Sequence, residues 1–91
     1  MMMGSVRGMI VRSLAGHDKG ELMVVVGVDG DGRLLLADGR RRKLAAPKKK
    51  KEKHVQFWGG AHRLSEEDML SDRGLRMALK RTGFFLETEE G

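Results

Sequence analysis

The sequence predicts a mainly β fold: a small five-stranded barrel followed by a short C-terminal helix. Five short apolar or alternating stretches lie between residues 9 and 57, and glycine-rich turns join them without room for crossover helices. A segment whose apolar residues recur at helical spacing follows after residue 65. Closing such a meander on itself removes its exposed edges, which favours a barrel over an open sheet. A chain of 91 residues is expected to form one small domain with a thin core.

Five strands are expected, and turn residues mark the breaks between them. The expected strands cover residues 9–14, 22–28, 34–37, 40–45 and 54–57. Valine dominates the second strand and leucine the third, whereas His-Val-Gln-Phe in the fifth alternates polar and apolar residues. The Asp-Gly pairs at residues 29–32 and 38–39 predict tight turns, and Pro47 is expected to end the fourth strand.

The last third of the chain has a different pattern. Residues 59–62, Gly-Gly-Ala-His, predict a linker, and Ser65 followed by three acidic residues is typical of a helix start, with a second start at Ser71. Apolar residues then recur at helical spacing, and Gly83 is expected to end a helix of about three turns. The expected division of the chain is a flexible N-terminus at 1–5, the barrel at 6–58 with a basic arm at 40–53, and linker, helix and frayed acidic tail at 59–91.

The positive charge is concentrated in one segment. The net charge is +5, but residues 40–53 hold nine basic residues against the single acid Glu52, while the remaining chain holds nine basic and twelve acidic residues. A block of like charge repels itself and is stabilised when a polyanion lies against it. The charge by itself leaves two interpretations open, a solvated surface and a contact for a polyanion such as a nucleic acid.

Several classes of function are disfavoured by composition. The chain has no cysteine, no apolar stretch near the roughly 18 residues of a membrane span, and no apolar signal-peptide core, so we expect a cytoplasmic protein. We expect no metal and no cofactor, because the three histidines are far apart in sequence and the acidic turn at 29–32 lacks the spacing of a calcium loop. Ser13, His17 and Asp18 are close in sequence, but nothing indicates an oxyanion hole beside them, so we expect no enzyme. Only four aromatic residues occur, too few for a base-stacking platform.

Residues 16–20, Gly-His-Asp-Lys-Gly, allow two interpretations. Glycine accepts positive φ and Asp18 can bond to nearby backbone, which predicts a tight turn between two strands. Alternatively, bare backbone N–H groups and Lys19 could face a phosphate, as in anion-binding nests.

The stretch GMIVRSLAGHDKGELMVVV, residues 8–26, resembles the KOW motif, a strand–loop–strand unit of certain ribosomal proteins and transcription elongation factors. The matching positions are Gly8, Val11, the 16–20 loop and the apolar run from Leu22. The basic residues downstream are similar to those of small bacterial KOW-domain RNA-binding proteins related to archaeal and eukaryotic large-subunit ribosomal proteins. A second glycine that many KOW motifs carry is absent, since Glu21 follows the loop, and this fits the ribosomal branch better.

The resemblance implies an SH3-like barrel that binds structured ribosomal RNA (rRNA) through its backbone, in the ribosome or an associated ribonucleoprotein of translation, with ribosomal proteins as further neighbours. We expect no DNA sequence specificity and no membrane partner. Residues 16–20 would approach the RNA closely, residues 40–43 would line one face, and residues 48–53 would form an arm that orders on contact. The residues expected to contact RNA are Gly16, His17, Lys19, Gly20, Arg40, Arg41, Arg42, Lys43, Lys48, Lys49, Lys50, Lys51, Lys53 and His54. The alternative is an SH3-like protein-interaction module whose basic arm binds an acidic partner.

Overall fold

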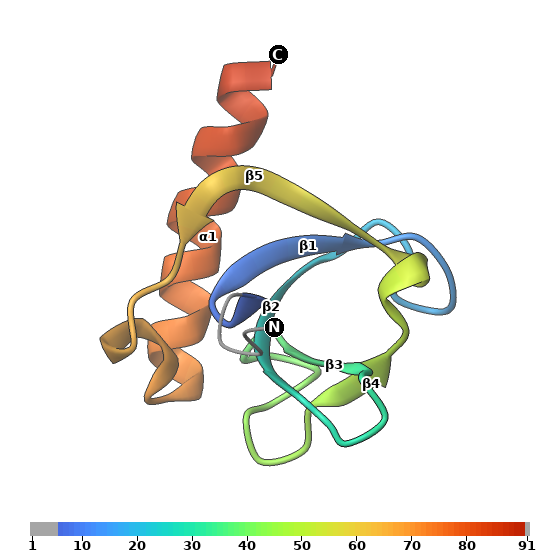
Figure 1. Cartoon of the computed structure of the whole chain (residues 1–91). Helices are drawn as coiled ribbons and strands as arrows, with labels where there is room; N and C mark the ends of the chain where they lie inside the picture. Colours follow the sequence, from blue (N-terminus) through green and yellow to red (C-terminus); the bar gives the residue numbers. More distant parts are fainter. Residues whose placement is uncertain (1–5, 91) are drawn as a thin grey trace.

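A computed structural model describes residues 6–90, with side chains for 6–58 and 63–82. Five antiparallel strands form one strongly curved sheet in the order β4-β3-β2-β1-β5, and a single α-helix lies beside it (Figure 1). The elements are β1 (Met9–Ser13), β2 (Leu22–Val28), β3 (Leu34–Ala37), β4 (Lys48–Lys50), η2 (Glu52–His54), β5 (Val55–Arg63), η3 (Glu67–Met69) and α1 (Asp72–Glu90). The predicted mainly β fold with five strands and a C-terminal helix is confirmed. The prediction for residues 1–5 lies outside the described residues.

The sheet is open in its hydrogen bonding. Its edges are β4 and β5, and no ladder joins them among the strands that the structure describes. The two edge strands are connected in sequence by the single turn of η2. The expected closure of the meander into a barrel is therefore not seen as strand pairing.

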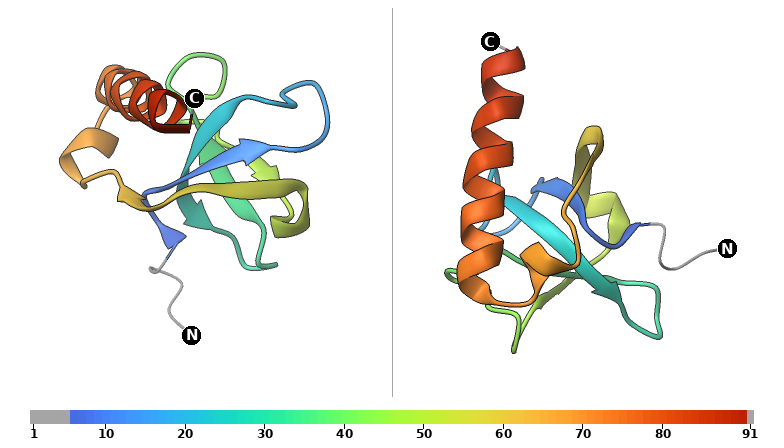
Figure 2. Two further views of the ribbon diagram at one scale, coloured as in Figure 1. Left: turned by 90° about the horizontal axis from the view of Figure 1, so that it is seen from above. Right: turned by 90° about the vertical axis from the view of Figure 1, so that its left-hand side faces the viewer.

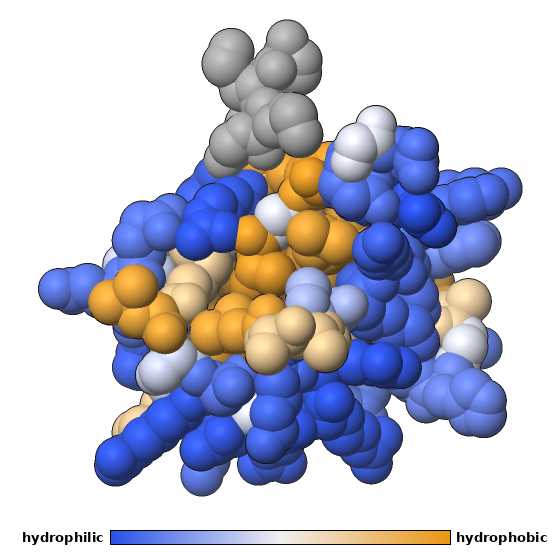
Figure 3. All heavy atoms as spheres, turned by 90° about the horizontal axis from the view of Figure 1, so that it is seen from below, coloured by the Kyte–Doolittle hydropathy of each residue, from blue (hydrophilic) through white to orange (hydrophobic). Residues whose placement is uncertain are grey.

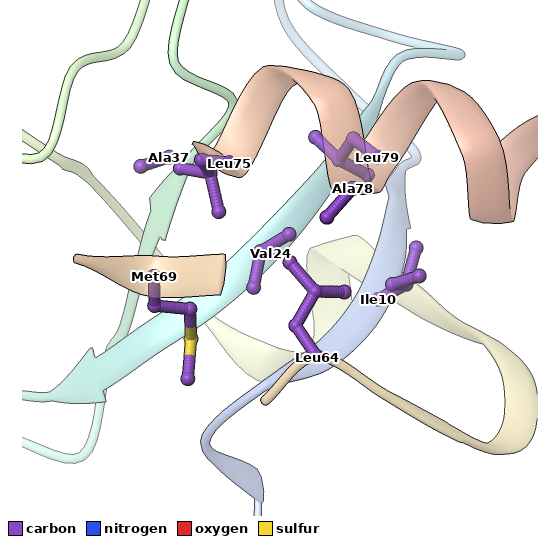
Figure 4. Packing of buried hydrophobic residues seen from close by; sticks show 8 residues of the cluster. All are labelled: Ile10, Val24, Ala37, Leu64, Met69, Leu75, Ala78 and Leu79. Carbon is purple, nitrogen blue, oxygen red and sulfur yellow. The ribbon is translucent and has the colours of Figure 1, made fainter. Parts of the chain in front are cut away.

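Both faces of the central strands are buried, which explains why the valine and leucine runs do not alternate. Ile10 and Val24 are paired across β1 and β2 and face α1, where they belong to a cluster that includes Leu75 of the helix (Figure 4). Other residues of the central strands point to the opposite face, among them Val11 of β1 and Leu36 of β3, which belong to a second cluster inside the curve of the sheet. The helix thus covers one face of the sheet, and the curve of the sheet encloses the other.

The turns of the first half follow the sequence prediction. Gly16 and Gly20 both have positive φ, at 87° and 90°, so the 16–20 loop is a tight turn between β1 and β2. In the β2–β3 hairpin, the Oδ1 atom of Asp29 accepts hydrogen bonds from the backbone N–H groups of Asp31 and Arg33, both at 2.9 Å. The Asp29 carboxylate therefore accepts the backbone hydrogen bonds that hold this turn.

Three sequence predictions are wrong. Residues 40–45 form a loop, and the fourth strand lies instead at Lys48–Lys50, immediately after Pro47. Residues 59–62 are not a linker, because β5 continues through them to Arg63. The helix does not end at Gly83 but continues to Glu90, so most of the acidic tail is helical rather than frayed. None of the helices in the described part of the chain is long and apolar enough to cross a membrane.

Candidate nucleic-acid interface

Several backbone N–H groups in and next to the 16–20 loop donate hydrogen bonds to nearby backbone carbonyls of the same turn. Lys19 N–H donates to the Gly16 carbonyl at 3.2 Å, Gly20 N–H to the Ser13 carbonyl at 2.8 Å, and Glu21 N–H to the Asp18 carbonyl at 3.0 Å. These three N–H groups are thus used inside the turn, which leaves them unsuited to an anion-binding nest. The side chains of His17 and Lys19 are exposed. The turn interpretation therefore describes the backbone, and any contact with a ligand falls to the exposed side chains.

Asp18 is the hub of an ionic cluster under this loop. Its Oδ1 atom accepts hydrogen bonds from the Lys50 ammonium at 2.8 Å and from the Ser13 hydroxyl at 2.7 Å. Its Oδ2 atom lies 3.0 Å from the Lys48 ammonium. Burial of this carboxyl raises its pKa, but the hydrogen bonds from Lys50, Ser13 and Lys48 outweigh that effect and hold the pKa of Asp18 well below its ordinary value of 3.8. Asp18 is therefore ionised and neutralised internally.

Strand β4 divides the lysine run between two sides of the sheet. Alternate residues of a strand point to opposite faces, so Lys48 and Lys50 both reach Asp18 while Lys49 is exposed. The side chain of Lys50 is only 7% exposed, and its ammonium also donates to the Ser13 hydroxyl and the Ala15 carbonyl, each at 2.7 Å. An ammonium has three donors, and all three are satisfied here. Lys50 thus joins β4 to the 16–20 loop rather than to solvent.

The basic loop at residues 40–43 is folded around Asp38. The Oδ1 atom of this buried aspartate accepts hydrogen bonds from the backbone N–H groups of Arg40 at 2.8 Å and Arg42 at 3.0 Å. The N–H groups of Asp38 and Gly39 both donate to the Arg42 carbonyl, at 2.9 and 3.1 Å. Because the backbone polar groups of the loop bond inward, the arginine side chains are left to point outward, and all of them are exposed.

The first turns of α1 hold this loop in place. Gly39 has a positive φ of 79°, and a Cβ atom there would lie 2.3 Å from the Asp72 carbonyl oxygen, so only glycine fits against the helix. The Arg76 guanidinium donates to the Gly39 carbonyl at 2.8 Å. At the far end of the loop, Leu44 N–H donates to the Asp72 carboxylate at 2.8 Å. The helix therefore fixes both ends of the basic loop.

The two loops meet at one shallow hollow. Figure 2 (left) shows the loop after β1 and the loop after β3 on the same side of the molecule, away from the β2–β3 turn. Between them lies a hollow of about 230 Å³ lined by His17, Asp18, Glu21, Met23, Asp38, Arg41, Arg42 and Lys48. Glu21 and Arg41 form an exposed ion pair there, with 3.7 Å between the guanidinium nitrogen and the carboxylate oxygen. The structure thus brings together two segments that are about 20 residues apart in the sequence.

The predicted site residues fall into three groups. His17, Arg41 and Arg42 are exposed and line the hollow together with the half-buried Lys48, while Gly16, Lys19, Gly20, Arg40 and Lys43 are exposed elsewhere in the same two loops. Lys50 is buried. Lys49, Lys51, Lys53 and His54 are exposed on β4 and η2, and the His54 carbonyl accepts a hydrogen bond from Leu14 at the start of the first loop. The segment named as the basic arm at 40–53 is a clamped loop followed by a strand and a helical turn, so residues 48–53, which were expected to order only on contact, already form β4 and η2.

Sequence reasoning missed the residues that support the site. Asp38, Asp72 and Arg76 position the basic loop. The sequence indicates a turn-forming role for Asp18 and does not reveal its contacts with Lys48 and Lys50. The Asp38-Gly39 pair carried a usable signal, because aspartate before a tight turn commonly accepts backbone hydrogen bonds. Asp72 and Arg76 lie 34 and 38 positions after Asp38 and carry no local signal.

Comparison with known proteins adds no assignment: no protein-family model matches the chain, and no curated protein matches it. Within the part of the chain that the structure describes, no group of three or more histidine, cysteine, aspartate or glutamate side chains could hold a metal ion. The chemistry of the basic surface therefore carries the functional interpretation.

Proposed function

We propose that this protein is a non-catalytic RNA-binding protein that holds the sugar–phosphate backbone of structured RNA. The single observation that carries the proposal is the convergence of the 16–20 loop and the 40–43 loop at one hollow, with their cationic side chains exposed. The sequence resemblance to KOW-domain proteins agrees with this reading and supports a cytoplasmic, ribosomal or ribosome-associated setting.

The charges around the hollow favour a phosphate-rich ligand. Two of the three lining carboxylates are engaged internally, because Asp18 pairs with two lysines and Asp38 accepts backbone hydrogen bonds. Lys19, Arg42 and Lys43 have no ion-pair partner among the described residues. Arginine presents its donors as a planar fork that fits phosphate oxygens, and each neutralised phosphate releases bound counterions.

The structure changes the expected division of roles among the lysines. Lys50, and to a lesser degree Lys48, are engaged with Asp18 and support the loop from below. The proposed phosphate contacts therefore fall to Lys19 and residues 40–43, and to the exposed lysines of β4 and η2: Lys49, Lys51 and Lys53. These contacts supply affinity with little sequence information, as expected for A-form RNA recognised by its backbone.

The described aromatic side chains do not form a base-stacking surface. Phe57 is half-buried against the inner core cluster, and Trp58 is half-buried against the cluster under the helix. The Arg12 guanidinium lies 4.5 Å from the centroid of the Trp58 ring and so occupies one face of it. Backbone contacts are therefore favoured over stacking of splayed bases.

The decisive experiment compares two double variants of equal charge. Arg41→Gln/Arg42→Gln removes two cations beside the hollow, whereas Arg33→Gln/Arg81→Gln removes two cations elsewhere: the half-buried Arg33 of the β2–β3 turn and the exposed Arg81 of α1 beside Asp68. RNA affinity is measured by fluorescence anisotropy with a labelled RNA hairpin from about 50 to about 300 mM salt.

We expect the first variant to lower the slope of log K against log salt by roughly 1.4 to 1.8, at roughly 0.7 to 0.9 for each contact, and to bind roughly 15- to 30-fold more weakly near 0.15 M salt. The control should keep the slope of the parent protein. Equal losses in the two variants, or no binding of structured RNA by the parent protein, would overturn the proposal. Crosslinking in cells followed by sequencing of the bound RNA then tests the ribosomal setting, which requires enrichment of rRNA.

One observation keeps a protein-interaction role as the second candidate. The face seen in Figure 3 carries an apolar area surrounded by hydrophilic residues. Separately from that view, Leu70 and Met77 are large apolar residues that are 79% and 57% exposed. Apolar surface of this kind can mark a protein-binding site. Recovery of an acidic protein partner whose binding is lost in Arg41→Gln/Arg42→Gln, with no RNA bound, would favour this candidate.

A further inference from the structure

A second hollow adjoins the first and reaches the helix. It has a volume of about 240 Å³ and is lined by Glu21, Leu22, Asp38, Arg40, Arg76, Leu79 and Lys80. Two of these residues, Glu21 and Asp38, also line the first hollow, so the two hollows are neighbours, one beside the 16–20 loop and the other beside α1. Figure 2 (left) shows the loop after β3 between α1 and the loop after β1, in agreement with this order.

The cations of the second hollow come from two separate elements. Arg40 belongs to the basic loop, whereas Arg76 and Lys80 are one helical turn apart on α1 and therefore lie on the same side of the helix. Arg40 and Lys80 are exposed and have no ion-pair partner among the described residues. The sequence pattern does not connect Lys80 with Arg40, because the two residues are 40 positions apart.

The local geometry prepares Arg76 to contact a ligand. One of its terminal nitrogens donates to the Gly39 carbonyl at 2.8 Å, which fixes the guanidinium beside the basic loop. A guanidinium has five N–H donors, and this bond uses one of them. Leu22 and Leu79 form an apolar part of the wall.

The size and charge of the hollow suit a small anionic group. Pockets for drug-sized molecules occupy roughly 300 to 1,000 Å³, so a hollow of about 240 Å³ fits only part of a larger ligand. Of its two carboxylates, Asp38 is committed to the backbone of the loop, and Glu21 is shared with Arg41. The hollow is therefore lined by three cations, Arg40, Arg76 and Lys80, and by only one carboxylate, that of Glu21, that is not engaged with the backbone of the loop.

We propose that the second hollow binds a backbone phosphate of the same RNA, so that α1, through Lys80 and Arg76, extends the interface beyond the basic loop. This inference rests on the proposed RNA-binding function and adds a contact that the KOW-like segment does not contain. The RNA backbone would pass from the 16–20 loop over residues 40–43 and onto the helix.

The test uses neighbouring residues on different sides of α1. Lys80→Gln removes a cation from the hollow, whereas Arg81→Gln removes an equal charge that lies 3.8 Å from Asp68 on the side of η3. Lys80 and Arg81 are both exposed, so the variants should unfold at nearly the same temperature. Both are titrated with salt against the labelled RNA hairpin, together with the parent protein and Arg41→Gln/Arg42→Gln.

We expect Lys80→Gln to lower the slope of log K against log salt by roughly 0.7 to 0.9 and to weaken binding roughly four- to fivefold near 0.15 M salt, with Arg81→Gln unchanged. If Lys80→Gln and Arg81→Gln behave alike while Arg41→Gln/Arg42→Gln loses affinity, the helix contact is wrong and the proposed function stands. If the parent protein binds no structured RNA, both are wrong.

Discussion

Replacing Asp18 by asparagine tests the ionic cluster under the 16–20 loop. The substitution keeps the shape of the side chain but removes the only carboxylate within reach of the Lys50 ammonium among the described residues. That ammonium is buried and would retain only neutral partners, the Ser13 hydroxyl and the Ala15 carbonyl. Removing one partner of a buried ion pair is costly because the other charge stays buried without compensation.

The expected loss of stability is large for a chain of this size. Breaking a buried pair costs about 3 to 5 kcal/mol, and we take the lower end, about 3 kcal/mol, because the Asp18 side chain is 13% exposed and asparagine can still accept hydrogen bonds. For a domain of this size each kcal/mol shifts Tm by about 4 to 8 °C, so Asp18→Asn should melt at least about 12 °C below the parent protein.

The effect should depend on pH in a defined direction. The pKa of Asp18 is lowered in the folded state, so the stabilisation is fully present above its unfolded-state value near 3.8 and is lost as the pH falls below that value. The difference in unfolding free energy between the parent protein and Asp18→Asn should therefore be constant near neutral pH. It should shrink steadily as the pH drops below about 4.

Urea unfolding followed by the fluorescence of Trp58, the single tryptophan, measures this difference. Lys50→Met and Lys49→Met form a matched pair from the same strand, and only the first should destabilise the protein, since Lys49 is exposed. The double variant Asp18→Asn/Lys50→Met should lose less than the sum of the two single losses. Equal stability of the parent protein and Asp18→Asn at neutral pH, or additive losses, would refute the cluster.

Two further predictions test the clamp on the basic loop and the charge between the hollows. Gly39→Ala should cost at least about 3 kcal/mol in urea unfolding, because it adds a clash with the Asp72 carbonyl to the positive φ, whereas Gly20→Ala, with nothing within 4 Å, should cost only about 1 to 2 kcal/mol. Equal costs would argue against the clamp. Glu21→Gln should bind the RNA hairpin about two- to fivefold more tightly, because it removes a carboxylate from both hollows and releases Arg41. Weaker or unchanged binding in anisotropy titrations would contradict the placement of bound RNA beside Glu21.

Elements defined by local patterns were predictable from the sequence. β2 and β3 follow the valine and leucine runs with the expected bounds, and the glycines at 16 and 20 mark a turn because they adopt positive φ. These features depend on residues adjacent in the chain, so periodicity and turn chemistry suffice to find them.

The errors concern segments whose conformation depends on distant residues. The 40–45 stretch has no local reason to avoid a strand, but Asp38 and the first turn of α1 capture its backbone. β4 consists of three lysines, so no polar–apolar alternation could reveal it, and only its pairing with the leucines of β3 places it. Gly83 has the sequence context of a helix end, yet α1 continues through it. In each case tertiary contacts override a local preference.

The candidate site was likewise predictable where its residues have a local sequence signal and unpredictable where distant residues determine their environment. The exposed cations of the 16–20 and 40–43 loops all follow from charge and motif, and two of them, Arg41 and Arg42, line the hollow between the loops. Charge alone could not separate Lys50 from its neighbours, because its burial arises from a carboxylate 32 positions earlier in the chain.

The alternation of β4 also gives neighbouring lysines different chemical reactivity. Amine-directed reagents need an accessible ε-amino group, and Lys50 does not offer one, since its nitrogen is buried and enclosed by three hydrogen-bond acceptors. Lys49, Lys51 and Lys53 are open to solvent and available for modification. Labelling followed by peptide mapping would leave Lys50 intact in the folded protein and modify it on unfolding. In an RNA complex, protection from labelling should therefore be measured at Lys49, Lys51 and Lys53. Modification of Lys50 in the same sample would indicate that the protein has unfolded.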